Sequence, residues 1–229
     1  MEDKYFLRIL PLYGVLPILC SVLFNILVYF GNRIFTSSWK HYELSLPIDD
    51  LIPFESWAIV FYLGAYLLWV VGVLFIAREE KALCYELFSG ELLGKLLCLL
   101  FFLFLPTYMA TRPDGLEAHS LFDRLTRIVY DLDPPDNLFP SIHCMESWVV
   151  LHASFRCRRL RRPVFWRVPF LLGTLAVFLS TLLVKQHVLL DVLGGVAVAE
   201  AGMFLARVLN AGRIYPALAR LFRRNRSAS

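Results

Sequence analysis

Two ionisable side chains, His187 and Asp191, lie four residues apart at the start of an apolar run, in the segment KQHVLLDVLGG. Helical spacing of four places both on one face, one turn apart. A carboxylate in that position can hydrogen-bond one imidazole nitrogen and leave the other free to attack a substrate or to bind a metal ion. Because ionisable residues at membrane depth are costly, we interpret the pair as functional.

A second histidine, His143, lies upstream in NLFPSIHCMES. Two histidines and a carboxylate, with basic groups close by, suit attack on a phosphorus centre. One imidazole, oriented by the carboxylate, would form a covalent phosphohistidine, and the other would protonate the departing alkoxide and later activate the incoming hydroxyl. Arg112 offers a planar fork for the phosphate oxygens, and Lys185 offers a compact point charge.

The composition indicates an integral membrane protein. Hydrophobic residues make up 58% of the 229-residue chain, above the roughly 45–50% that is usual for soluble domains. They gather in runs of about 20 residues, the length of a membrane-spanning helix. The five cysteines lack CxxC spacing, so we interpret them as small buried hydrophobes rather than a disulfide or zinc framework. We expect one all-α domain over residues 1–229.

Six spans are predicted, over about residues 10–31, 57–77, 92–110, 141–156, 166–184 and 188–209. The first is longer than the apolar part of a signal peptide and lacks a small-x-small cleavage site, so we expect it to be retained. The fourth is short and semi-polar, and such a helix must face the bundle interior. The segment 111–140 contains four prolines and is predicted to be a loop with one short helix.

Basic residues predict the orientation. The connection between spans four and five reads RCRRLRRPVFWR, and the tail contains ARLFRRNRS. Excess Lys and Arg mark cytoplasmic segments, so both termini are expected in the cytoplasm. The 111–140 loop, the start of span four and the turn between spans five and six then share the outer face. The short chain, without a soluble extension, leads us to expect a bacterial cell membrane.

The blocks FPSIH and S-x6-H-x3-D resemble the type 2 phosphatidic acid phosphatase (PAP2) superfamily. This superfamily includes lipid phosphatases, bacterial acid phosphatases, vanadium haloperoxidases and sphingolipid headgroup transferases. The motifs run from Arg112 to Gly195, and the layout of spans is similar over the whole chain. The resemblance implies a six-helix membrane bundle of the PAP2 type, with its active site on the non-cytoplasmic side.

The third motif of that family implies that His187 is the nucleophile and Asp191 its orienting carboxylate. Ser180, seven residues before His187, has the position of a serine that hydrogen-bonds phosphate. This chain departs from the motif at Thr181, where the family has arginine. Lys185 could replace the missing cation as a phosphate ligand.

The second motif implies that His143 is the general acid and Ser141 a phosphate ligand. Arg112, followed by proline, matches the end of the first motif and is a phosphate ligand by the same resemblance. Leu105 stands where the first motif would have lysine, and Ile142 replaces the glycine usual in the phosphatases. An apolar residue at that position resembles the inositol phosphorylceramide synthase branch, whose members transfer a phosphorylated headgroup.

The leading hypothesis is therefore an enzyme that breaks a phosphoester or phosphoanhydride bond in a lipid and passes the phosphoryl group to water. Its rival passes a phosphoryl-headgroup to a lipid alcohol. The non-catalytic alternative is that the hydrogen bond between His187 and Asp191 is structural and only caps the outer end of the sixth span.

Other functions are less well supported by the residues. A small transporter or channel could relay protons through the two histidines and the aspartate, although the chain lacks the repeat between halves that such proteins often have. The same three residues could bind a metal ion, but the third-motif spacing favours the covalent route. We expect no cofactor and no metal ion, membrane lipids and a lipid phosphate as partners, and no nucleic acid, because the basic run lies directly between two spans. The sequence does not predict an oligomeric state.

Overall fold

Helices make up almost all regular structure in the computed structural model, which describes residues 5–6, 10–36, 38–113, 115–157 and 163–226. The longer helices are α1 (Leu12–Ile26), α3 (Ile59–Ala77), α4 (Lys81–Phe104), α6 (Ile142–Arg156), α7 (Pro163–Leu183) and α8 (Leu189–Val208), and the shorter ones are α2 (Asn32–Thr36), α5 (Leu121–Leu132) and α9 (Ile214–Arg226). A π-helical turn, η1 (Leu27–Gly31), joins α1 to α2, and the 3-10 turns are η2 (Asp49–Leu51), η3 (Ser56–Ala58) and η4 (Ala211–Arg213). The prediction of an all-α fold is confirmed.

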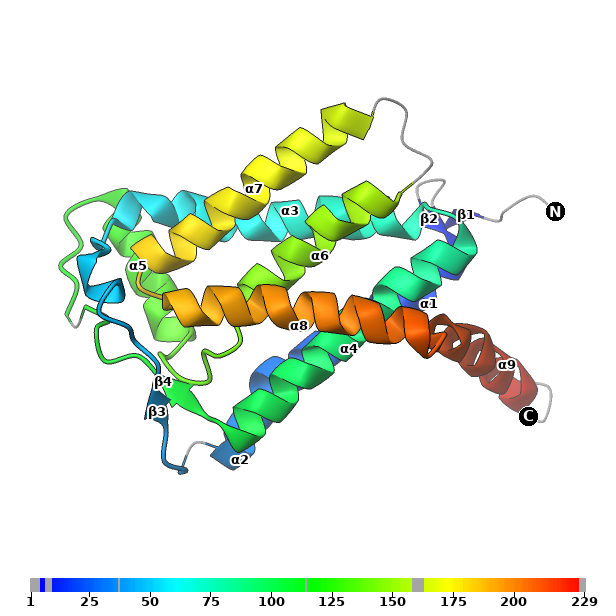
Figure 1. The fold of residues 1–229 in the computed structure, drawn as a ribbon, viewed down its shortest axis with the longest axis horizontal. Coiled ribbons are helices and arrows are strands. Elements are labelled where there is room, and N and C mark those ends of the chain that lie inside the picture. Colours follow the sequence, from blue (N-terminus) through cyan, green and yellow to red (C-terminus); the bar gives the residue numbers. More distant parts are fainter. Residues whose placement is uncertain (1–4, 7–9, 37, 114, 158–162, 227–229) are drawn as a thin grey trace.

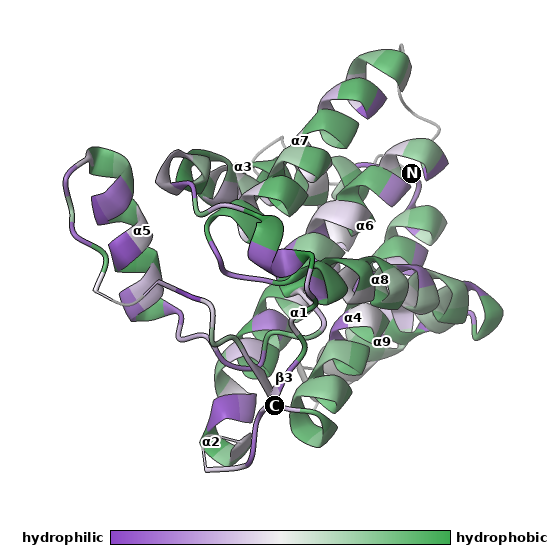
Figure 2. Ribbon diagram, turned by 60° about the vertical axis from the view of Figure 1, so that its left-hand side comes forward, coloured by the Kyte–Doolittle hydropathy of each residue, from purple (hydrophilic) through white to green (hydrophobic). Residues whose placement is uncertain are grey.

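Four two-residue strands occur at the ends of the bundle. β1 (Tyr5–Phe6) and β2 (Leu10–Pro11) pair antiparallel, and β3 (Tyr42–Glu43) and β4 (Thr107–Tyr108) pair parallel. Figure 1 shows α5, β3 and β4 at one end of the long helices, and β1, β2 and α9 at the other. In Figure 2 the long helices are mainly green, whereas α5 and the loops beside it carry much of the purple, hydrophilic colour. The bundle therefore has one end built from polar loops.

Five helical segments among the described residues are long and apolar enough to cross a membrane: Leu12–Thr36, Ser56–Ala77, Lys81–Phe104, Val164–Leu183 and Leu189–Val208. They correspond to five of the six predicted spans. The predicted fourth span is α6, which has only 15 residues, fewer than the ~20 needed to cross a bilayer. Helices α3, α4, α7 and α8 all pack against α6. Because these neighbours shield α6 from lipid, it does not need a long apolar surface.

The third predicted span, 92–110, differs most from its helix. Helix α4 begins at Lys81, eleven residues earlier, and ends at Phe104. Its early turns contain charged residues, which an apolar window excludes, but Glu91 is buried and paired with Lys95. The helix ends where Pro106 approaches, because proline disfavours helical backbone in the residue before it.

Close helix contacts fix the relative positions of the helices that carry the predicted site. A side chain at Gly202 of α8 would place its Cβ 2.3 Å from the carbonyl oxygen of Gly90 in α4. At the polar end, a Cβ at Gly195 would lie 2.6 Å from the carbonyl oxygen of Ser141. Glycine is thus needed for α8 to approach both α4 and the start of α6.

The predicted orientation depends on segments that the structure describes only in part. The basic run at 158–162 and the last residues of the tail, 227–229, lie outside the described residues. In Figure 1 the C-terminal end of α6, which leads to the basic run, lies at the same end of the bundle as α9. The N-terminal end of α1 lies there too. The loops around α5 are at the opposite end, as the prediction of a shared outer face requires.

Candidate active site

His187 and Asp191 form the predicted pair. His187 Nδ1 lies 3.2 Å from Asp191 Oδ2, and the two residues are 9% and 1% exposed. The pair does not lie on one helix face, however, because α8 begins only at Leu189. Asp191 Oδ2 also accepts a hydrogen bond from the backbone N–H of Val188 at 3.0 Å. The carboxylate therefore caps the helix N-terminus and orients the imidazole that precedes it.

The backbone before His187 is held in a tight turn. The N–H groups of Gln186 and His187 both donate to the carbonyl of Thr181, at 2.9 and 3.1 Å. Lys185 has a φ of 50°, an uncommon value for a residue with a side chain. Its ammonium donates to the carbonyls of Asp49 at 3.0 Å and Ile52 at 2.6 Å. These bonds fasten the turn to the segment before α3, so the structure uses the Lys185 ammonium to hold backbone.

Asp49 gives this turn a second connection. Its Oδ1 accepts from the backbone N–H of Leu189 at 2.8 Å, and its Oδ2 accepts from that of Leu46 at 2.8 Å. The carboxylate is buried, with the residue 4% exposed. A distant loop thus caps α8 beside Asp191. In the sequence, Asp49 is only an acidic residue in a proline-bounded loop, and that pattern does not predict its contact with the start of α8.

His143 faces His187 from the first turn of α6. The two ring centroids are 5.9 Å apart, with a 57° angle between the ring planes. The Nε2 atom of His143 is buried and has no hydrogen-bond partner among the described residues. The two helices meet directly here, because Ser141 N–H donates to the carbonyl of Asp191 at 3.0 Å. The structure therefore brings His143, His187 and Asp191 together, as predicted.

Aromatic side chains of α3 enclose His143. The Tyr62 ring stacks on the imidazole with centroids 4.6 Å apart and planes 28° apart, and the Trp69 ring centroid is 5.2 Å away. Trp69 Nε1 donates to Ser147 Oγ at 3.0 Å, and that hydroxyl donates to the His143 carbonyl at 2.8 Å. Aromatics in membrane spans commonly lie at the lipid interface, so the sequence did not single out these two.

Arg112 lies in the loop after β4 and is buried, with 8% exposure. Its Nη1 donates to the Asp133 carbonyl at 2.7 Å, and its guanidinium carbon lies 3.6 Å from the centre of the Tyr130 ring. The Nε and Nη2 atoms are buried and have no hydrogen-bond partner among the described residues. Two adjacent guanidinium nitrogens with unpaired N–H groups form a fork that fits phosphate oxygens.

Tyr130 connects this fork to the histidine pair. Its hydroxyl donates to the carbonyl of Val184, in the turn before His187, at 2.6 Å. Burial lowers the pKa of Arg112 from its ordinary value, against the opposing influence of Tyr130 and Asp133. Burial also raises the pKa of Tyr130 to about 12, with Arg112 opposing the shift. Arg112 still carries its charge at neutral pH, because its pKa starts far above that range.

The two predicted serine ligands are both buried. Ser141 caps α6, with its Oγ 3.3 Å from the backbone nitrogen of Cys144. Ser180 donates to the carbonyl of Val177 at 2.8 Å within α7. Ser141 therefore lies at a helix N-terminus between the two catalytic candidates, where backbone N–H groups attract anions. For Ser180 and Lys185, a contact with phosphate stays a prediction.

Glu146 and Lys95 belong to a buried cluster of ionisable side chains. The Lys95 ammonium is 2.8 Å from Glu146 Oε1 and also pairs with Glu91 and with the carbonyl of Ser21 at 3.2 Å. This buried cluster connects α1, α4 and α6. Among the described residues, no group of three or more His, Cys, Asp or Glu side chains is placed to hold a metal ion.

A family model described as the PAP2 superfamily matches residues 79–214, more than half of the chain. This chain belongs to the PAP2 superfamily. The matched region contains α4 to α8 and with them all seven predicted site residues. No curated protein and no solved structure matches the chain.

PAP2 membership supports an activity of the phosphatase or phosphotransferase type. The aromatic side chains that enclose His143 come from α3, which precedes the matched region. Their contacts are therefore a property of this chain's structure rather than of the family match.

Proposed function

We propose that this PAP2 protein is a membrane lipid phosphatase that hydrolyses a lipid phosphate or diphosphate through a phosphohistidine, at the outer face of a bacterial cell membrane. The observation that carries the proposal is the His187–Asp191 hydrogen bond of 3.2 Å with the His143 ring 5.9 Å from that of His187. One imidazole is oriented by a carboxylate, and the other is near enough to act on the same phosphorus centre.

In the first step, His187 Nε2 attacks phosphorus as the bond to the leaving oxygen breaks. His143 gives its proton to that oxygen, so the leaving group departs protonated there, as a lipid alcohol from a lipid phosphate or as a lipid monophosphate from a diphosphate. In the second step, His143 takes a proton from water, and the resulting hydroxide breaks the N–P bond and releases phosphate. Asp191 stabilises the positive charge on His187 when the phosphohistidine forms.

The phosphate oxygens need cations and N–H donors in the transition state. The unpaired Nε and Nη2 of Arg112 and the N-terminus of α6 at Ser141 supply such donors. The family's two further cations are replaced by Leu105 and Thr181, which makes Arg112 the main phosphate ligand in this proposal. A lipid substrate fits a site built at the end of helices that are apolar enough to span a membrane.

The test is phosphate release by the detergent-purified protein from a panel of lipid phosphates and diphosphates, with His187→Ala beside it. Release by the parent and its loss in the variant would support the phosphatase and rank its substrates. Full turnover in the variant would refute a nucleophilic His187.

Headgroup transfer to a lipid alcohol is the second candidate. It is favoured by the surroundings of His143, because Ile142 precedes it and the rings of Tyr62 and Trp69 cover it. An apolar enclosure disfavours water as the acceptor and favours a lipid hydroxyl. Phosphate release from none of the lipids, together with transfer between a labelled donor and an acceptor lipid, would replace the phosphatase by this reaction.

A further inference from the structure

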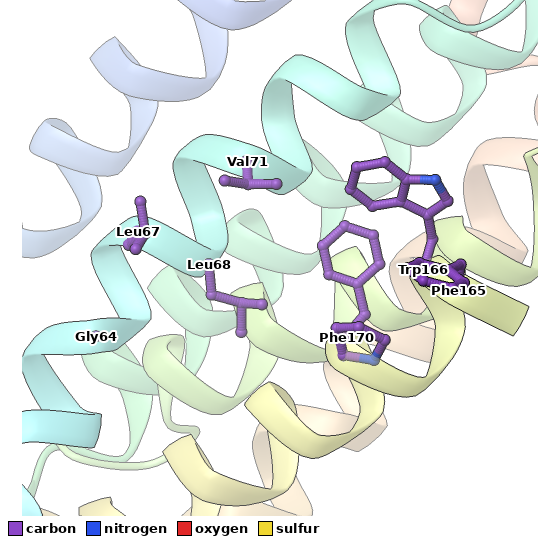
Figure 3. A pocket seen from close by; sticks show the side chains of 8 residues that line it. Gly64, Leu67, Leu68, Val71, Phe165, Trp166 and Phe170 are labelled. Atoms are coloured by element: carbon purple, nitrogen blue, oxygen red, sulfur yellow. The ribbon is translucent and has the colours of Figure 1, made fainter. Parts of the chain in front are cut away.

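Helix α3 meets His143 with one face, on which Tyr62 lies. Its opposite face borders an apolar groove of about 480 Å³ between α3 and α7. Figure 3 shows Leu68 and Val71 of α3 beside Phe170 of α7 in this groove. The groove therefore lies apart from the histidines, whereas polar contacts from the first span lead directly into the candidate site.

The first span ends in the π-helical turn η1, which is followed by the short helix α2. Such turns are rare and are often found at functional sites. This one contains Tyr29, whose hydroxyl donates to Asp133 Oδ1. Arg33 lies four residues later in α2, and its guanidinium carbon is 4.8 Å from the centre of the Tyr29 ring. The two side chains thus reach the loop after α5 together.

Arg33 makes two ion pairs with this loop. Its Nη2 donates to Asp133 Oδ1 at 3.0 Å, and its Nε donates to Asp136 Oδ1 at 2.9 Å. The side chains of Arg33 and Asp133 are each 20% exposed, and that of Asp136 is 30% exposed. Charge-assisted hydrogen bonds are short and directional. Because Tyr29 and Arg33 bond the same oxygen, they fix the orientation of the Asp133 carboxylate.

The main chain of Asp133 holds Arg112. Its N–H donates to the Val129 carbonyl at 2.8 Å, at the end of α5, and its carbonyl accepts from Arg112 Nη1 at 2.7 Å. The same guanidinium lies over the Tyr130 ring. A bond on Nη1 and a ring against the guanidinium plane set the direction in which the unpaired Nε and Nη2 point. A rotation of the Asp133 peptide would therefore turn the fork.

The direction of this fork matters because the site has few other cations. Leu105 and Thr181 stand where the family has lysine and arginine, and the Lys185 ammonium bonds two backbone carbonyls. Bidentate binding by arginine requires two N–H groups aligned with two phosphate oxygens. A misdirected fork should weaken phosphate binding without any change in the charge of Arg112.

We propose that Tyr29 and Arg33 are positioning residues that direct the Arg112 fork toward phosphate through Asp133. This inference rests on the proposed function, in which Arg112 is the main phosphate ligand. Both positioning residues precede the region that the family model matches, 79–214. The first span of this chain thus contributes to phosphate binding as well as to anchoring in the membrane.

The test titrates the detergent-purified protein with inorganic phosphate and follows binding by phosphorus NMR. Tyr29→Phe removes one hydroxyl, and Arg33→Gln removes both ion pairs. Thr36→Val is the matched control, because Thr36 Oγ1 accepts from Asn137 Nδ2 at 3.1 Å and so joins α2 to the same loop through Asn137 rather than Asp133.

We expect the Kd for phosphate to rise about fivefold in Tyr29→Phe, the effect of one lost hydrogen bond, and at least as much in Arg33→Gln. Thr36→Val should stay within about twofold of the parent, because its lost bond does not lead to Arg112. Equal weakening in all three variants would show a general loosening of the loop and overturn the proposal. A parental Kd in Tyr29→Phe and Arg33→Gln would overturn it as well.

A double substitution tests whether the effect passes through the guanidinium. In Arg112→Lys the fork is replaced by an ammonium, a point charge that does not need the alignment of a planar fork. Adding Tyr29→Phe to Arg112→Lys should then change the Kd for phosphate by less than about twofold. A repeated fivefold loss in that background would overturn the proposal.

Because the titration does not require turnover, its outcome is separate from that of the phosphatase assay. If lipid phosphates release no phosphate, but Tyr29→Phe weakens phosphate binding and Thr36→Val does not, the positioning role stands and hydrolysis is refuted. If the parent releases phosphate and Tyr29→Phe binds phosphate as the parent does, hydrolysis stands and the positioning role is refuted.

Discussion

Asp191→Asn changes the candidate site by one atom type, and the structure indicates a specific consequence. Asp191 Oδ2 makes both bonds of this carboxylate: it accepts from the Val188 N–H at 3.0 Å and lies 3.2 Å from His187 Nδ1. An asparagine oxygen in the place of Oδ2 can accept from both groups, because each of them can donate an N–H. The imidazole therefore keeps its proton on Nδ1 and a free Nε2. What the variant loses is the negative charge that stabilises the imidazolium.

The expected size of the effect follows from this loss of charge. A hydrogen bond to a charged group contributes ~1.5–3 kcal/mol and one between neutral groups ~0.5–1.5 kcal/mol, so the transition state loses about 1–2 kcal/mol, or roughly 5- to 30-fold in kcat. The fold should be affected less, because the lost charge at the N-terminus of α8 is worth only about 0.3–1 kcal/mol. A change of that size shifts the Tm by only a few degrees in a chain of this length.

The assay is phosphate release measured beside thermal unfolding. Asp49→Asn is the matched control, because Asp49 is buried, caps the same helix through the Leu189 N–H at 2.8 Å, and its other carboxylate oxygen accepts from the Leu46 N–H rather than from a histidine. We expect Asp191→Asn to lose roughly 5- to 30-fold in kcat while Asp49→Asn keeps its kcat within about twofold of the parent. A parental kcat for Asp191→Asn, or equal losses in both variants, would refute a role for the Asp191 charge in the reaction.

Three further outcomes are expected. Trp69→Phe keeps a ring beside His143 but removes the 3.0 Å hydrogen bond to Ser147. Because one lost hydrogen bond costs roughly 1 kcal/mol, kcat should fall about three- to tenfold with KM unchanged. An unchanged kcat would contradict a positioning role for Trp69. Arg112→Lys should make activity fall at alkaline pH, because only the protonated amine binds phosphate. Burial lowers the pKa of Arg112, and the same burial should lower the pKa of a lysine there below its ordinary value. A pH profile that matches the parent's would argue against Arg112 as the phosphate ligand. Phosphate release should be the same before and after dialysis against a chelator, and loss of activity that added divalent metal restores would contradict the covalent mechanism.

The contact between His187 and Asp191 was predictable because the two residues are close in sequence. His187 and Asp191 needed only one local turn to meet, and the third-motif spacing supplied it. The detail was wrong, since Asp191 caps α8 and leaves His187 before the helix. A capping carboxylate and a mid-helix carboxylate have the same spacing in sequence, so the pattern could not separate them.

Contacts made over long sequence separations could not be predicted. Lys185 resembles a phosphate ligand by charge and position, but its ammonium bonds the carbonyls of Asp49 and Ile52. Nothing local to Lys185 shows that this loop returns to it. The stacking of Tyr62 on His143 joins α3 to α6 in the same way, and an aromatic residue in an apolar span gives no sign of such a partner.

The predicted spans differ from the helices where charged side chains are buried inside the bundle. An apolar window placed the third span at 92–110, yet α4 extends back to Lys81 because Glu91 and Lys95 neutralise each other when buried. The same window accepted α6, whose 15 residues are short for a span. The packing of α6 behind its neighbours explains both its length and its polar residues.

The most direct test of the central claim is to trap the phosphorylated enzyme. The purified protein would be mixed with a lipid carrying a radiolabelled phosphate, quenched within one turnover, and digested to locate the label. The proposed mechanism predicts a label that is lost in acid, survives alkali, lies on His187, and is absent from His187→Ala. A label on another residue, or no labelled enzyme in a protein that releases phosphate at full rate, would contradict it.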